Sequence, residues 1–121
     1  MTVIKHLIAL TSLLILLACS PPASEGVGHW GGRNHSITAE VAPGTGLSDV
    51  VYIVTIDGQT VIRQPIPRSE QSVDMGVQLS ATGTYNGASV RAVHEQKATL
   101  GQLYFQDKIY INGELVAVIS P

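Results

Sequence analysis

Three dipeptides of the form Asp-Gly or Asn-Gly, each between runs of β-forming residues, most constrain the fold of this 121-residue chain. They stand at Asp57-Gly58, Asn86-Gly87 and Asn112-Gly113. Both central residues of a type I′ turn have positive φ, which Gly, Asn and Asp tolerate and β-branched residues do not. Such a dipeptide between β-formers is the strongest short-range signal of a β-hairpin. Three of them in one small chain predict an all-β, antiparallel fold.

The hairpin around Asn86-Gly87 can be tested against its side-chain pattern. A two-residue turn there pairs Tyr85 with Ala88 and, further from the turn, Leu79 with His94, and directly opposed residues share a face. One face is then mostly apolar: Val73, Met75, Val77, Leu79, Ala81, Gly83, Tyr85, Ala88, Val90 and Ala92. The other face is polar except for Val93. Because a slip of one residue would destroy this sorting, the pattern predicts this register.

The same reasoning assigns faces in the other two hairpins. Around Asn112-Gly113 the predicted core face holds Phe105, Ile109, Ile111, Val116 and Val118, with Asp107 as a misfit. The reverse face holds Tyr104, Lys108, Tyr110, Leu115, Ala117 and Ile119. Around Asp57-Gly58 both faces are apolar: Val50, Val54, Ile56 and Val61 on one, and Val51, Ile53 and Ile62 on the other. We therefore expect this last strand pair to be the most buried, with Pro65 and Pro67 ending its second strand.

These hairpins and the segment "SITAEV" before them predict a β-domain over residues 36–121 with six or seven antiparallel strands. Two packed sheets and a small, partly open barrel both satisfy this pattern, and we favour the small antiparallel β-sandwich. We expect it to follow an N-terminal signal helix and a flexible tether.

The N-terminal 18 residues have the features of an export signal. Lys5 precedes an apolar run of twelve residues, 7–18, which is too short to cross a bilayer as a helix and fits the core of a secretory signal. The residues Leu16-Leu17-Ala18-Cys19 resemble the lipobox of bacterial lipoproteins. The resemblance implies cleavage before Cys19 and lipidation of that cysteine, which anchors the chain to the membrane. The alternative is a plain secreted protein with one free thiol.

Ser20 follows the cysteine, where the sorting rule of such lipoproteins implies transfer to the outer membrane, here facing the periplasm. Cys19 is the single cysteine, so the lipidated chain has no thiol left. With Lys5 removed, six Lys and Arg side chains face nine Asp and Glu side chains, a formal charge of −3. This charge and the lack of a Lys/Arg run argue against a nucleic-acid site.

Residues 19–35 are rich in Pro, Gly and Ser without a hydrophobic period, which predicts a flexible linker. The linker holds His29, Trp30 and His35, and two histidines without a third ligand do not predict a metal site. Trp30 is expected at the bilayer interface, at the edge of the domain or in a partner contact.

No enzyme is predicted. The chain has no Gly-x-Ser-x-Gly, no His-Glu-x-x-His and no phosphate-binding loop, and no cysteine is free to act as a nucleophile. We expect no metal and no cofactor. His94 is interpreted as a strand-end histidine. Asp107 leaves three alternatives: a hydrogen-bonded structural group, a residue turned outward by a bulge, or a functional site.

One surface suggests binding. Tyr104, Lys108 and Tyr110 share a face of one strand, where aromatic rings beside a cation suit recognition of a protein or a glycan ring. Half-buried tyrosines also simply complete a sheet. The three hairpins are similar to those of small uncharacterised exported β-proteins of Gram-negative bacteria, and this resemblance implies no activity. We expect a non-enzymatic envelope lipoprotein that binds a protein partner or supports an envelope assembly. The alternative is a small-ligand or glycan-binding lipoprotein that uses the tyrosine face.

Overall fold

A computed structural model describes residues 23–44, 50–66 and 77–121, and every regular element in these ranges is a β-strand. The predicted signal helix of residues 1–18, Cys19 and the first residues of the tether lie outside the described residues. Within the described ranges, no helix has the length and apolar character needed to span a membrane.

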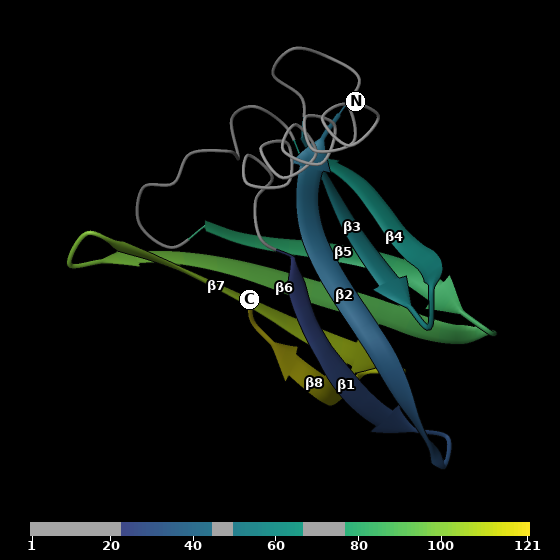
Figure 1. Cartoon of the computed structure of the whole chain (residues 1–121). Helices are drawn as coiled ribbons and strands as arrows, with labels where there is room; N and C mark the ends of the chain where they lie inside the picture. Colours follow the sequence, from purple (N-terminus) through teal and green to yellow (C-terminus); the bar gives the residue numbers. More distant parts are fainter. Residues whose placement is uncertain (1–22, 45–49, 67–76) are drawn as a thin grey trace, which may run out of the picture.

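The eight strands form two antiparallel sheets of four, and in each sheet the strand order follows the chain order. The first sheet holds β1 (Ser24–Trp30), β2 (Arg33–Pro43), β3 (Val50–Ile56) and β4 (Gln59–Ile66). The second holds β5 (Val77–Tyr85), β6 (Ala88–Thr99), β7 (Gln102–Ile111) and β8 (Glu114–Ile119). Figure 1 shows the two sheets packed together with their strands crossing at a large angle. The predicted β-sandwich is confirmed, with eight strands instead of six or seven.

The prediction of a linker over residues 19–35 is wrong from Ser24 onward. This segment forms β1, a turn at Gly31-Gly32 with φ values of 60° and 76°, and the start of β2. No hydrophobic period marks β1 because its inward positions before Trp30 are the small residues Ser24, Gly26 and Gly28. A Cβ added to Gly26 would lie 2.3 Å from Ile119 Cγ2, and one added to Gly28 would lie 2.8 Å from the Trp30 ring. The β-domain therefore includes the segment from Ser24 onward. On β1, neighbouring groups pack closely against glycines in place of large apolar side chains.

The three predicted turns are confirmed. Both central residues of each have positive φ, from 48° to 50° at the Asp or Asn and from 80° to 84° at the Gly. The register predicted around Asn86-Gly87 is also confirmed, with Tyr85 opposite Ala88 and Leu79 opposite His94. A further turn of this kind, not predicted, joins β6 to β7 at Leu100-Gly101, where the Leu has a φ of 52°.

Two β-bulges reverse part of the predicted face assignment. In β4, Thr60 pairs with Thr55 and Ile62 with Val54, which leaves Val61 as the extra residue. In β8, Leu115 pairs with Tyr110 and Ala117 with Ile109, which leaves Val116 as the extra residue. An extra residue moves every following side chain to the other face. In β8 the bulge therefore buries Ala117 and Ile119 and leaves Val118 exposed, contrary to the prediction, and in β4 it places the buried Ile62 opposite Val54.

We expected the β3–β4 pair to be the most buried in the fold, and this prediction holds for β3 alone. Tyr52, Val54 and Ile56 of β3 are fully buried, whereas β4 buries only Ile62. The core to which they belong draws on both sheets and contains Ile37, Ala39, Tyr52, Val54, Ile56, Ile62, Ala81, Tyr85, Val90, Ala92, Ile109, Ile111, Ala117 and Ile119.

The two sheets repeat one plan. The amide N of Asp57 donates to the Ser36 carbonyl at 2.8 Å, and the amide N of Asn112 donates to the Ser89 carbonyl at 2.9 Å. The side-chain Oδ1 of Asp57 and of Asn112 accepts in return from the amide of the same serine, in each case at 2.9 Å. Each turn is followed by a bulge at the same place in the ladder. Counted from these turns, Tyr52 in β3 and Asp107 in β7 are equivalent positions.

The sheet edges meet at two corners. At one corner β1 approaches β8, and Glu25 forms an isolated antiparallel bridge with Ser120. At the other, β5 passes so close to β4 that a Cβ added to Gly83 would lie 2.0 Å from the Val61 carbonyl oxygen. Gly26 and Gly83 are equivalent in the two sheets, since they pair with Ile37 and Val90, the residues after Ser36 and Ser89.

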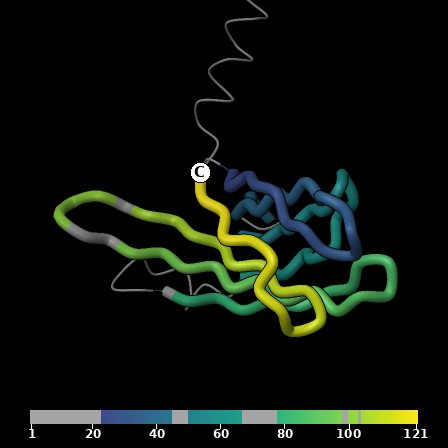
Figure 2. Tube along the Cα trace, turned by 90° about the horizontal axis from the view of Figure 1, so that it is seen from below, coloured from purple at the N-terminus to yellow at the C-terminus, as the bar shows by residue number. Residues whose placement is uncertain are grey.

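One hairpin projects from the sandwich. Among the described residues, β5 pairs with β6 as far as Gln96, and β8 pairs with β7 as far as Asp107. Residues 97–106, which we call the β6–β7 arm, continue as a two-stranded hairpin to the Leu100-Gly101 turn. Figure 2 shows this hairpin extending away from the first sheet.

Candidate functional site

A polar cluster lies in the core between the two sheets. Asp107 of β7, only 1% exposed, accepts a hydrogen bond from the Tyr52 hydroxyl at 2.6 Å, and the same carboxylate oxygen lies 2.7 Å from His94 Nδ1. Of the three alternatives for Asp107, the hydrogen-bonded structural group is therefore the one observed. His94 is buried in the middle of β6, so its interpretation as a strand-end histidine is wrong.

Hydrogen bonds hold both the histidine and the tyrosine of this cluster in place. His94 Nδ1 faces the carboxylate and donates to it, while Nε2 lies 3.0 Å from the amide nitrogen of Gln96, which can only donate. Both ring nitrogens thereby have a partner within the cluster. Burial, followed by the negative charge of Asp107, raises the pKa of Tyr52 well above 10, so its hydroxyl stays a donor.

The space beside the cluster is small. A cavity of about 30 Å³ is lined by Ser24, Ala39, Glu40, Val41, His94, Phe105 and Asp107. This volume suits about one water molecule and excludes a substrate. The cluster therefore joins the two sheets without offering a site between them.

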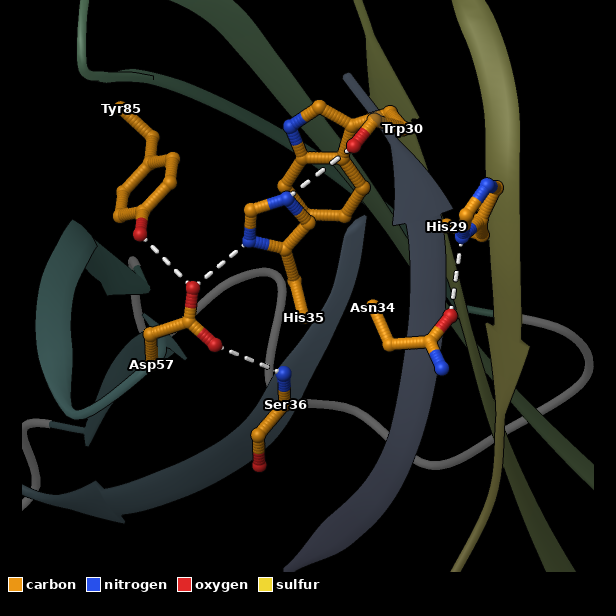
Figure 3. Close-up of polar contacts among 7 residues, drawn as sticks. All are labelled: His29, Trp30, Asn34, His35, Ser36, Asp57 and Tyr85. Carbon is orange, nitrogen blue, oxygen red and sulfur yellow. Dashed lines mark hydrogen bonds and ion pairs between the residues drawn. The ribbon is translucent and has the colours of Figure 1, made fainter. Parts of the chain in front are cut away.

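A second polar cluster lies at the surface, around the first predicted turn (Figure 3). Asp57 accepts from the Tyr85 hydroxyl at 2.7 Å, and the same oxygen lies 2.7 Å from His35 Nδ1. His35 Nε2 lies 3.2 Å from the Trp30 carbonyl, and the indole stacks on the imidazole with centroids 3.8 Å apart. The hydrogen bond from His35, then those from Tyr85 and the Ser36 amide, lower the pKa of Asp57 to about 2.

This cluster fixes the end of the sandwich. Both nitrogens of His35 face acceptors, so the ring is not placed to remove a proton from a ligand. Trp30 packs against the core. Of the three positions expected for Trp30, this is the one at the edge of the domain. His29 instead approaches Asn34, with 2.9 Å between Nδ1 and Oδ1, and does not converge with His35. Over the described residues, no three His, Cys, Asp or Glu side chains gather in a way that could hold a metal.

The predicted binding residues Tyr104, Lys108 and Tyr110 lie on the outer face of β7, but their surroundings differ. Tyr104 is 53% exposed, Lys108 Nζ lies 3.6 Å from Glu95, and the Tyr110 ring is covered by the Arg91 guanidinium, 4.1 Å from its centroid. Six residues of strand span roughly 20 Å, so the two rings cannot hold one small sugar between them.

A hollow of about 300 Å³ opens on the arm beside Tyr104. Its lining comes from β6, β7 and the end of β8: Glu95, Lys97, Tyr104, Phe105, Gln106 and Ser120. Glu95 lies 3.8 Å from Lys97, and its side chain is 14% exposed against 67% for Lys97. Lys97 is therefore the more exposed member of the ion pair that lines the hollow. No local pattern in the sequence could have indicated this hollow, because three separate strands build it.

These features define the described part of the molecule as a small two-sheet β-sandwich with one polar cluster inside it, a second polar cluster at its surface, and a hollow on a projecting hairpin. Comparison with family models, with curated proteins and with solved structures gave no significant match.

Proposed function

We propose that this protein is a non-enzymatic envelope lipoprotein, held to the outer membrane by lipid on Cys19, whose β-domain binds a protein partner or supports an envelope assembly. The observation that carries the binding proposal is the β6–β7 arm, which projects from the sandwich and presents the hollow beside Tyr104. The anchor is supported by the lipobox-like residues before Cys19.

The arm has the chemistry of a recognition surface. Leu100 at its tip is fully exposed, and Tyr104 is more than half exposed. Aromatic side chains are enriched among the residues that dominate binding energy at protein interfaces. The two histidine–aspartate pairs are occupied by structural hydrogen bonds, which favours binding over catalysis.

A small ligand is the second candidate, because a volume of about 300 Å³ lies at the lower end of the range of ligand pockets. Such a ligand would contact Tyr104 and Lys97. Tyr110 lies outside this hollow, so a glycan site would involve only one of the two tyrosines.

The anchor is tested by Cys19→Ser in the full chain. We expect this variant to lose lipid labelling and to leave the membrane fraction, because the thioether can no longer form. Retention in the membrane fraction would show that residues 7–18 act as an uncleaved anchor and would contradict the proposal.

The binding role is tested in cells by placing a photo-cross-linking amino acid at Gln106, next to the hollow, with Thr84 on exposed β5 as the control position. We expect a protein adduct from Gln106 and none from Thr84. Tyr104→Ala should remove most of the adduct, whereas Tyr110→Ala, on the same face but away from the hollow, should leave it unchanged. Equal adducts from both positions, or none, would contradict a protein-binding arm.

A further inference from the structure

In the part of the chain that the structure describes, the arm has one strand edge that pairs with no other strand. The β8 ladder on β7 ends with the pair Asp107 and Ile119, whereas β7 itself begins five residues earlier, at Gln102. From Gln102 to Gln106, β7 pairs with β6 on one side and with no described strand on the other.

The direction of the backbone groups at this edge follows from the turns. The pair that closes a two-residue hairpin exchanges both of its hydrogen bonds, and the direction then alternates along the strand. The closing pair of β6 and β7 is Thr99 and Gln102, so even-numbered residues of β7 bond to β6. Leu103 and Phe105 therefore direct their N–H and C=O groups to the open edge.

Other edges of the sandwich are protected in ways that proteins commonly use. At one corner β1 and β8 cover each other, and β4 carries Pro65, which has no N–H to offer. Proline on an edge strand blocks the addition of another strand. The segment Gln102–Gln106 contains no proline.

The hollow lies along this edge and favours a particular occupant. A strand added beside Phe105 would place alternate side chains on the outer face, against Tyr104 and Gln106. Lys97 and Lys108 share Glu95 as their ion-pair partner on this outer face, so the three side chains carry a net charge of +1, which suits acidic side chains on the added strand. A second copy of this chain would instead bring the same lysines together, and like charges oppose such a symmetric contact.

We infer that the edge of β7 from Gln102 to Gln106 binds an extended, acidic segment of another polypeptide as an additional β-strand. This rests on the proposed binding function and names its mode. Main-chain hydrogen bonds to Leu103 and Phe105 supply affinity, and the hollow beside Tyr104 selects the side chains.

The test uses the purified full chain in detergent micelles and a peptide of about ten residues that alternates valine and glutamate. We expect saturable binding with hydrogen exchange at the amides of Leu103 and Phe105 slowed by about tenfold or more, and with no change at the amide of Gly58, which lies in an exposed turn of the other sheet. The same peptide with lysine in place of glutamate should bind about tenfold more weakly.

A matched pair of variants separates the backbone from the side chain. Leu103→Pro removes an outward N–H and should weaken binding about tenfold or more, whereas Leu103→Ala keeps that N–H and should stay within about threefold of wild type. The exchange measurement on the unaltered chain decides the matter if the proline variant does not fold. Absence of binding, or binding that leaves the two amides unprotected, overturns the inference, as does dimerisation of the chain through this edge. An in-cell adduct at Gln106 together with unprotected amides would leave the proposed function standing and refute only strand addition.

Discussion

Replacing Gly83 by alanine tests the close approach of β4 and β5. The new Cβ would lie 2.0 Å from the Val61 carbonyl oxygen and 3.0 Å from Ile62 Cγ1. An ordinary C···O contact is about 3.3 Å or longer, so one strand would have to move by more than about 1 Å. Overpacking usually costs about 1–3 kcal/mol, and the obstacle here is backbone, which places the expected loss at about 3 kcal/mol. For a domain of this size that lowers the melting temperature by about 12–24 °C.

Thermal unfolding followed by far-ultraviolet circular dichroism measures this loss, with two comparisons. Thr82→Ala, at an exposed position on the same strand, should change stability by less than about 0.5 kcal/mol. Gly26→Ala, at the equivalent position in the other sheet, meets the Ile119 side chain, which can turn aside, and should cost less than Gly83→Ala. Melting of Gly83→Ala within about 3 °C of wild type would refute the reasoning.

The other predictions concern the turns and the two polar clusters. Replacing Gly58, Gly87 or Gly113 by valine should destabilise the domain by about 1 kcal/mol or more in each case, because β-branched residues fit positive φ poorly. Urea unfolding measures this loss, and unchanged unfolding midpoints would contradict type I′ turns. The hydrogen bonds of Asp57 lower its pKa from 3.8 to about 2, so its contribution to stability is fully present above pH 3.8 and is lost as the pH falls through about 2. The difference in unfolding free energy between wild type and Asp57→Asn should therefore be largest near neutral pH and shrink below pH 3.8; a difference independent of pH would contradict this linkage. Tyr52→Phe should leave the tyrosinate absorbance up to about pH 11 unchanged, because burial and Asp107 keep the Tyr52 phenol protonated, and a smaller absorbance in the variant would refute the raised pKa.

The turns could be predicted because their signal is local. Asx-Gly dipeptides between β-formers determine turn type, and the turn determines the register of the adjoining pair. Val61 and Val116 show why prediction stops at the next step, since a bulged valine looks like any other strand valine in the sequence. The bulge follows from how the strands twist and pack, and it reverses every later side chain in the strand.

The first strand and the interior cluster were missed for a different reason. At Gly26 and Gly28, inward positions are small because other groups come close, so the period of apolar residues is absent. Tyr52 and Asp107 lie in different sheets and 55 residues apart, and nothing local pairs them. Asp107 was recognisable as a misfit on an apolar face, which pointed to a partner without naming it.

The Tyr52–Asp107 hydrogen bond has a consequence for how copies of the chain stay separate. Because the two sheets repeat one plan, a first half from one molecule could in principle pack on a first half from another, a known hazard of repeated structures. In that arrangement Tyr52 would meet a second Tyr52, whereas two second halves would bring two buried Asp107 carboxylates together. Each hydroxyl would lose its carboxylate, and apposed buried carboxylates repel. The unlike Tyr52–Asp107 pair therefore favours the packing of a first half on a second half and disfavours the packing of two like halves from different molecules.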